Sequence, residues 1–363
     1  MPKHLPVVIS QGQSANPQKR GLEEELVAQL LMEPGIEVTL VPHLYDLKPD
    51  GTGMLCLQNM PGNFVVISWL YERAAFWTLD RNKVRGRFGQ TVLKFETDDE
   101  DDGEAAETAA DEKARVDAER TKPNRTIHCL DFRAADNAEA FVREIRRIRD
   151  EAAVQTHALD MGGLGIGGGS SNGGSDMPAT EFLQGSPTTE QLAKLDSPSD
   201  RNVDAQPTVI EEPAGRRWYP VIDFSRCTNC MECIDFCLFG VYGVDTVDTI
   251  LVEQPDNCRK GCPACSRVCP ENAIIFPQHK SPAIAGSPDV EAGGLKVDLS
   301  KLFGAPDESP EAAAVRERDE QLMLAGRDKV GAGVGLKKRQ ADKSDQPKDE
   351  LDNLMDQLDE LDI

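Results

Sequence analysis

Short apolar runs and one amphipathic stretch open the chain. Continuous apolar runs at residues 6–10 and 64–68 predict buried strands, and the alternating residues 36–41 predict another strand. Leucine and valine residues three and four positions apart predict a helix over residues 21–32, which a Pro-Gly pair ends.

Two further elements are expected between residues 125 and 155. A strand forms around Ile127 and Leu130, and a helix over residues 138–154 carries its apolar residues on one face. Strands that alternate with helices predict a small α/β domain over residues 1–155, with a sheet that is at least partly parallel.

Parts of this domain allow both a ligand-binding and a structural interpretation. The loop at residues 10–19 follows the first strand, where α/β sheets place ligands, but it lacks a complete phosphate-binding fingerprint. An ordinary connecting loop is the alternative. The isolated thiols of Cys56 and Cys129 are expected in the core. Four aromatic residues pack either against a flavin or within the core, namely Trp69, Tyr71, Phe76 and Trp77.

An acidic segment interrupts the α/β domain. Residues 96–119 hold 12 acidic and two basic side chains, which predicts an exposed insert over residues 96–121 that is either disordered or a solvated helix. The functional alternative is that this charge steers the protein toward a basic partner surface.

A segment rich in Gly, Ser and Pro follows at residues 156–214 and predicts a flexible linker. Residues 163–168 satisfy G-x-G-x-x-G, but no strand precedes them and no helix follows, so the pattern does not indicate a nucleotide site. Such a linker would let the parts on either side of it move independently.

The tail at residues 283–363 is expected to be mostly disordered, with short helices. One helix is expected over residues 311–325, and the glycine-rich residues 331–335 are interpreted as linker. Leucines at three- and four-residue steps in residues 349–363 predict an acidic amphipathic helix. That helix docks either onto a partner or back onto the protein itself.

Eight of the ten cysteines fall between residues 221 and 277. The first four are spaced C-x2-C-x2-C-x3-C, and the second four are spaced C-x3-C-x2-C-x3-C and followed by proline. Three thiolates this close together can hold three irons of one inorganic cluster, and the next cysteine then faces the other cluster. The eight residues are Cys227, Cys230, Cys233, Cys237, Cys258, Cys262, Cys265 and Cys269.

At these residues the segment 215–282, about a sixth of the chain, resembles the bacterial-type ferredoxin domain that holds two [4Fe–4S] clusters. The resemblance implies crossed ligation. One cluster would be held by Cys227, Cys230, Cys233 and Cys269, and the other by Cys258, Cys262, Cys265 and Cys237.

The sequence departs from the family pattern at two places. Leu238 stands where proline often follows the fourth cysteine, and three residues, not two, separate Cys258 from Cys262. Gly261 would permit a bulged loop that absorbs the extra residue. The alternative is that Cys258 does not bind and the second site holds three irons.

The sequence around the cysteines repeats a β-α-β pattern, with an offset of 31 residues from Cys227 to Cys258 and 32 for the other three pairs. Metal binding is expected to supply much of the folding free energy of such a small unit. Apolar side chains are expected to surround the clusters and help set their reduction potentials, namely Phe236, Leu238, Phe239, Val268 and Ile274. The whole chain is thus expected to combine an α/β N-terminal domain with an α+β ferredoxin-like dicluster module, joined and followed by disordered segments.

Disulfides and structural zinc are the alternative interpretations of the cysteines. Disulfides need an oxidising compartment, which nothing else in the sequence indicates. Zinc sites usually draw their thiolates from two separated C-x2-C pairs, which the two runs of three cysteines do not resemble. The spacing therefore favours iron–sulfur clusters.

Charge and hydropathy restrict the partners. A net charge of −23 argues against nucleic-acid binding. Residues 216–280 are nearly neutral, with seven basic and eight acidic side chains, so the acidity lies in the insert and the tail. The start lacks a secretion signal, and the most apolar run, residues 64–71, is too short to cross a bilayer. A cytoplasmic protein without membrane insertion is expected.

The sequence favours an electron carrier, or an electron-transfer subunit, that relays single electrons through two [4Fe–4S] clusters to or from protein partners. The five histidines are scattered, and no nucleophile–base pair stands out, so no catalytic residue is assigned. One alternative is an oxidoreductase whose α/β domain binds a flavin or nucleotide and receives electrons from the module. The other is an interaction or assembly adaptor with structural clusters.

Overall fold

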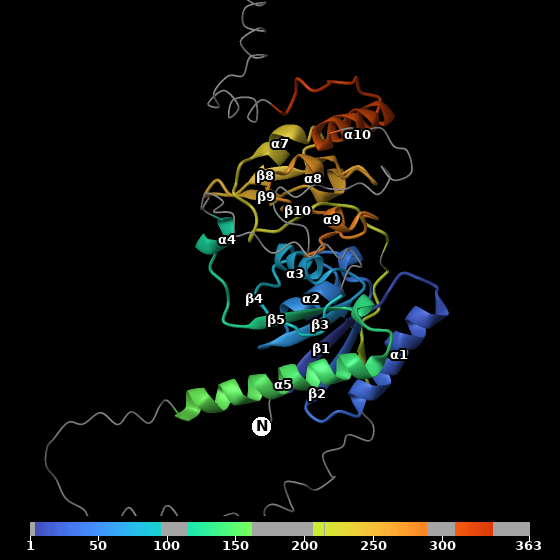
Figure 1. The fold of residues 1–363 in the computed structure, drawn as a ribbon, viewed down its shortest axis with the longest axis vertical. Helices are drawn as coiled ribbons and strands as arrows, with labels where there is room; N and C mark the ends of the chain where they lie inside the picture. Colours follow the sequence, from blue (N-terminus) through green and yellow to red (C-terminus); the bar gives the residue numbers. More distant parts are fainter. Residues whose placement is uncertain (1–3, 96–114, 162–205, 214, 289–308, 337–363) are drawn as a thin grey trace, which may run out of the picture.

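A computed structural model of the 363-residue chain describes residues 4–95, 115–161, 206–213, 215–288 and 309–336. The described residues form a parallel sheet with helices on both faces and, beyond the helices of one face, a smaller cysteine-rich module (Figure 1). The predicted segments 163–168 and 349–363 lie outside the described residues.

The sheet has six strands, and all of its pairings are parallel. Its central strands are continuous apolar runs because helices cover both faces, as parallel sheets require. The strand order is β4 (Arg87–Phe88), β5 (Thr126–Asp131), β3 (Phe64–Ser68), β1 (Leu5–Ser10), β2 (Ile36–Val41) and β6 (Thr208–Val209).

Helices α1 (Pro17–Leu31) and α5 (Ala138–Met161) pack together over one face of the sheet. Asn16 caps α1 by accepting a hydrogen bond from the amide of Gln18 at 2.9 Å, and proline occupies the first helical position. Leu26 of α1 and Phe141 of α5 join the same buried core as β1 and β3. Both helices begin earlier or end later than the apolar spacing predicted.

The other face carries elements that the apolar spacing did not predict. These are the 3-10 helix η1 (Leu44–Asp46), α2 (Thr52–Gln58) and α3 (Glu72–Arg81). Eight of the ten α3 residues are buried, since α3 has the sheet beneath it and the cysteine-rich module above it (Figure 1). The buried residues of α3 include the polar Arg73, Thr78 and Asp80, so apolar residues alone do not mark its buried surface.

Two segments expected to be unstructured pack against folded parts. Strand β6 lies within the predicted linker 156–214, pairs with β2 at the sheet edge, and leads to Glu212, which accepts a hydrogen bond from the Gly53 amide at 3.0 Å. The end of the predicted insert forms α4 (Val116–Glu119), and the Val116 amide bonds the Cys227 carbonyl at 3.0 Å. Residues 96–114 lie outside the described residues.

The cysteine-rich module contains two antiparallel strand pairs and two short helices. Strand β7 (Val221–Ile222) pairs with β10 (Ile274–Ile275), and β8 (Tyr242–Val244) pairs with β9 (Ile250–Val252). Helices α7 (Glu232–Phe236) and α8 (Ala264–Val268) follow the two cysteine loops and contact each other. The two halves thus interleave, each supplying strands and a helix, as the internal repeat predicts. The 3-10 helix η5 (Pro255–Asn257) lies between β9 and α8, and a further short helix, α9 (Pro282–Ala285), follows β10.

Part of the predicted disordered tail belongs to this module. Helix α10 (Pro310–Leu324) packs on α8, and Ala314 and Leu322 are buried. The side chain of Arg318 is also buried and donates to the carbonyls of Gly331 and Val334 at 2.7 and 2.8 Å. These bonds hold residues 331–335, which were interpreted as linker, against α10.

The module also packs on α3 instead of moving freely at the end of a linker. Tyr45 of η1 and Tyr219 are both fully buried, stack at 4.3 Å between ring centroids, and exchange hydrogen bonds. Trp77 of α3 meets Phe224 edge to face at 5.8 Å. Their neighbours Val221 and Ile275 complete one hydrophobic core shared by the sheet and the module.

One buried ion pair crosses this interface. The Arg73 guanidinium on α3 donates to the Asp223 carboxylate and to the Asn272 carbonyl. Asp223 is 1% exposed, so its charge depends on nearby cations for compensation. Among the described residues, no helix combines the length and the apolar character needed to span a bilayer.

Replacing Arg73 with alanine is expected to lower the free energy of unfolding by about 3 kcal/mol, because a buried carboxylate loses its main partner. Chemical denaturation under anaerobic conditions would measure this loss. Arg146→Ala is the matched control, since Arg146 pairs with Glu33 at the surface and is 51% exposed. Losses of equal size in the two variants would contradict the importance of the buried pair.

Candidate functional site

The first cysteine loop is shaped by two residues with left-handed backbone. Asn229 and Met231 have φ values of 57° and 63°, which bends the chain around the side chains of Cys227 and Cys230. The Asn229 amide donates to the Cys227 sulfur at 3.4 Å. Its side chain bonds the Asp248 carbonyl at 2.8 Å and the Ile250 amide at 2.9 Å, which fixes the loop to β9.

The second loop contains the extra residue before Cys262. Gly261 has a φ of 86°, a conformation that favours glycine, and the Cys262 amide donates to the Arg259 carbonyl at 3.0 Å. The loop therefore closes as a turn, as the bulge interpretation predicts. Cys258 remains partly buried and beside the other thiols of its loop.

The structure brings the cysteines together in two sets of four. Burial, together with the smaller effects of the neighbouring Cys269 and Cys230 thiols, raises the pKa of Cys227 to about 11, although the hydrogen bond from the Asn229 amide lowers it. Burial is also the largest cause of the raised pKa of Cys233, and the charges of Cys269, Cys227 and Cys230 raise this pKa by smaller amounts. Cys269, from the second motif, thus lies beside Cys227 and Cys233 of the first motif, and Cys230 lies beside the same two thiols. We call these residues the first thiol set.

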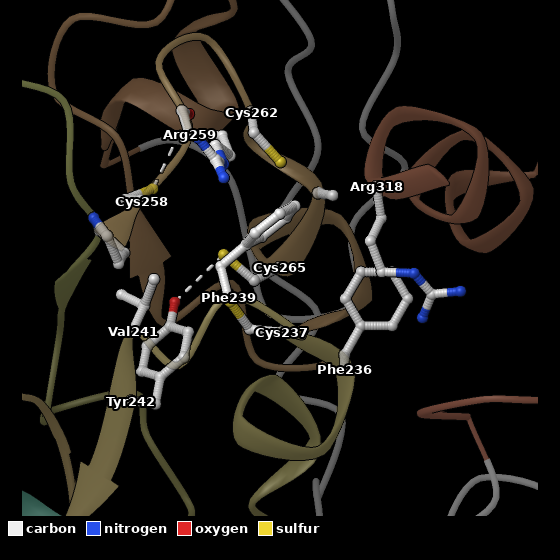
Figure 2. A pocket seen from close by; sticks show the side chains of 12 residues that line it. Phe236, Cys237, Phe239, Val241, Tyr242, Cys258, Arg259, Cys262, Cys265 and Arg318 are labelled. Carbon is white, nitrogen blue, oxygen red and sulfur yellow. Dashed lines mark hydrogen bonds between the residues drawn. The ribbon is translucent and has the colours of Figure 1, made fainter. Parts of the chain in front are cut away.

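The second thiol set is Cys237, Cys258, Cys262 and Cys265. Burial raises the pKa of Cys265, and the charges of Cys237 and Cys258 add to the effect. Burial likewise raises the pKa of Cys262 to about 11, again with Cys237 contributing. Figure 2 shows the four side chains around one small cavity.

Apolar side chains and hydrogen-bond donors surround the sulfurs of the second thiol set. Phe236, Phe239 and Val241 line its cavity, together with Ala264 and the stem of Arg318 (Figure 2). The backbone amides of Phe239 and Val241 bond the Cys237 sulfur.

Two further sulfurs, one in each thiol set, accept hydrogen bonds from the module. In the first thiol set, the Ala273 amide donates to Cys269 at 3.3 Å. In the second thiol set, the Tyr242 hydroxyl donates to Cys265 at 3.1 Å. Burial raises the pKa of Tyr242, so this hydroxyl keeps its proton.

Most of the apolar side chains expected around the clusters, which we call the jacket, lie beside the thiol sets. Phe236 and Val268 join Ala264 in a core under α10, while Ile274 lies in the core around Cys227 and Cys233. Leu238 is half-buried and belongs to neither core. Packing from α10 completes the jacket of the second thiol set. The sequence patterns indicated no part of the site on this helix.

The donor chemistry of both sets fits iron–sulfur clusters. All ten cysteines are free thiols, so the alternative of a disulfide framework finds no bond to support it. Among the described residues, no three His, Cys, Asp or Glu side chains lie close enough to hold a single metal ion. A [4Fe–4S] cluster makes a different demand, because each thiolate binds its own iron.

The loop at residues 10–19 of the α/β domain is not arranged to bind a phosphate. The Gly12 amide donates to the Glu23 carboxylate at 2.8 Å, and the Trp69 indole donates to the same oxygen at 2.6 Å. A side chain added at Gly12 would come within 2.9 Å of Trp69, so the position is filled. A carboxylate that occupies a loop amide disfavours an anionic ligand there, and these contacts support the connecting-loop interpretation.

The other residues singled out from the sequence lie apart from the thiol sets. Tyr71, Phe76 and Trp77 are core residues, and Trp69 stacks on Phe132 at 5.0 Å, so the aromatic group packs the domain. Cys129 is buried, as expected, whereas Cys56 is only partly buried.

Comparisons with known proteins support a ferredoxin-type segment. The chain is 50% identical over 66 residues to a protein of Methanocaldococcus jannaschii described as an uncharacterized ferredoxin. The match covers 18% of this chain and 44% of the relative, so this chain spans less than half the relative's length. No protein-family model matches the chain, and no solved structure matches it. The chain thus contains a ferredoxin-type domain.

Gly261→Ala is expected to lower the free energy of unfolding by about 1 kcal/mol, because a Cβ disfavours the left-handed backbone. Iron content should not change, since no neighbouring atom lies within 4 Å of the added carbon. Anaerobic denaturation with an iron assay measures both. Gly215→Ala adds a methyl group in equally open space without a positive φ and is the control. If both variants behave alike, the turn at Gly261 does not have this conformation.

Proposed function

We propose that this protein transfers single electrons through two [4Fe–4S] clusters, one held by each thiol set. The arrangement of Cys237 and Cys269 carries the proposal. Each lies at the end of one cysteine motif, yet its charge acts on thiols of the other motif. Cys269 acts on Cys227 and Cys233, and Cys237 acts on all three of the other cysteines in its set. Crossed pairing of this kind is the ligand pattern of two-cluster ferredoxins.

The donor set supports four-iron clusters at both sites. Cys258 contributes to the electrostatic environment of Cys265 and borders the same cavity as Cys262. The turn at Gly261 therefore leaves Cys258 available as a ligand, which supports a complete cluster over a three-iron site. When bound, each cluster would accept and release one electron at a time.

The protein's own residues would hold the clusters close together and exclude water. Helices α7 and α8 contact each other, and each carries one cysteine, Cys233 of the first thiol set and Cys265 of the second. Amide and hydroxyl donors stabilise negative charge on the sulfurs, and the apolar jacket limits access of solvent. None of these roles needs an acid or a base, so we propose an electron carrier or electron-transfer subunit.

The first thiol set offers the route to a partner. Cys230 is the one exposed cysteine of the chain, whereas α10 packs over the jacket of the second thiol set. Electron transfer becomes faster as the cofactor approaches the surface, so we propose that protein redox partners meet the module near Cys230. We also propose a cytoplasmic location, because free thiols persist in a reducing compartment.

Anaerobically prepared protein is expected to contain about eight irons and eight sulfides per chain, and to give an electron paramagnetic resonance signal on reduction. Iron and sulfide assays with spectra of the reduced protein measure this directly. Colourless protein that binds zinc would overturn the proposal.

Single serine substitutions test the crossed pairing. Cys269→Ser and Cys230→Ser are expected to alter the same resonance signal, while Cys237→Ser and Cys262→Ser alter the other, because each pair shares a cluster. Cys56→Ser is the control, since this thiol lies in the α/β domain outside both sets. If Cys269→Ser instead altered the signal affected by Cys262→Ser, each motif would hold its own cluster.

A further inference from the structure

One side-chain hydroxyl contacts a sulfur of the second thiol set. The Tyr242 hydroxyl donates a hydrogen bond to the Cys265 sulfur at 3.1 Å, and Figure 2 shows the tyrosine ring beside the cavity with its oxygen directed at that sulfur. Tyr242 is 6% exposed and Cys265 is 7% exposed, so water competes little for either group. Tyr242 begins β8, whose pairing with β9 fixes the position of the ring.

The internal repeat provides no such hydroxyl for the first thiol set. At the offset of 32 residues, Cys265 corresponds to Cys233 and Tyr242 corresponds to Ile274. Isoleucine cannot donate a hydrogen bond.

Backbone donors, in contrast, do repeat between the halves. The amides of Val241 and Ala273, which are also 32 residues apart, bond the sulfurs of Cys237 and Cys269. The Tyr242 hydroxyl therefore distinguishes two halves whose backbone donors to sulfur are otherwise equivalent.

Hydrogen bonds to sulfur affect the two oxidation states of a cluster unequally. Reduction adds negative charge, part of which lies on the ligand sulfurs, so a donor stabilises the reduced state more than the oxidised state. Apolar burial has the opposite effect, because a low-dielectric environment disfavours additional charge. Phe236, Phe239 and α10 bury the second thiol set, and the Tyr242 hydroxyl offsets part of that cost.

We infer that the Tyr242 hydroxyl raises the reduction potential of the cluster in the second thiol set, and so makes the two clusters unequal. This inference rests on the proposed function. Tyr242 acts through Cys265 and is a tuning residue, not a ligand. The consequence for electron transfer is that this hydroxyl favours residence of the electron on the more buried cluster.

Tyr242→Phe tests the inference because it removes one oxygen atom and keeps the ring. We expect the equilibrium constant for reduction of one cluster to fall about tenfold, which corresponds to about 59 mV for a one-electron couple. The other cluster should keep its potential. Redox titration followed by electron paramagnetic resonance measures both values, and Cys262→Ser identifies which signal belongs to the second thiol set.

Tyr219→Phe is the matched control within the same module. Tyr219 is buried like Tyr242, and its hydroxyl donates to the Tyr45 carbonyl at 2.9 Å instead of to a sulfur. This variant should lose stability without a change in either potential, so general loosening of the module can be told apart from loss of the sulfur contact.

The outcomes separate this inference from the proposed function. If Tyr242→Phe has a full iron and sulfide content but both potentials equal those of the unaltered protein, the inference is wrong and the function stands. Equal shifts of both clusters, or a shift matched by Tyr219→Phe, would also overturn it. Absence of clusters from the unaltered protein would instead overturn the function itself.

Discussion

The cost of placing thiolates in an apolar interior is the constraint on which the module depends. Burial is the largest cause of the raised pKa at Cys227, Cys262 and Cys265, so without iron these side chains favour the protonated form. Iron binding would reverse this preference by taking up the charge of four thiolates at each site. Formation of the proposed clusters is then inseparable from folding of the module.

The same constraint explains why so much of the chain packs around a small unit. Strands β7 to β10 are two or three residues long and cannot by themselves enclose the two thiol sets. Helix α10 covers α8, the segment at Val116 contacts the first cysteine loop, and α3 supports β7. Arg120 shows how these contacts combine, because it bonds Asp80 of α3 at 2.8 Å and lies over the Phe224 ring.

Sequence patterns predicted the elements whose signal is local. The apolar runs at β1, β2 and β3 depend on neighbouring residues, and the structure forms strands at these positions. The cysteine spacing is a local signal of the same kind. The patterns failed where burial comes from distant partners. The sequence suggests that Arg318 is a solvated charge in a polar tail, yet it is 1% exposed because the carbonyls of Gly331 and Val334 accept hydrogen bonds from its guanidinium. Strand β6 is only two residues long, and nothing around Thr208 in the sequence indicates pairing with β2.

The pairing of β6 with β2 determines which part of the fold depends on the sequence between α5 and β6. Both elements belong to the same domain, because α5 covers the sheet and β6 extends its edge. The described residues on both sides of 162–205 therefore belong to one folded body. Direct packing through the Tyr45–Tyr219 stack and the Arg73–Asp223 pair sets the position of the module on the sheet, so this position does not depend on the length of residues 162–205.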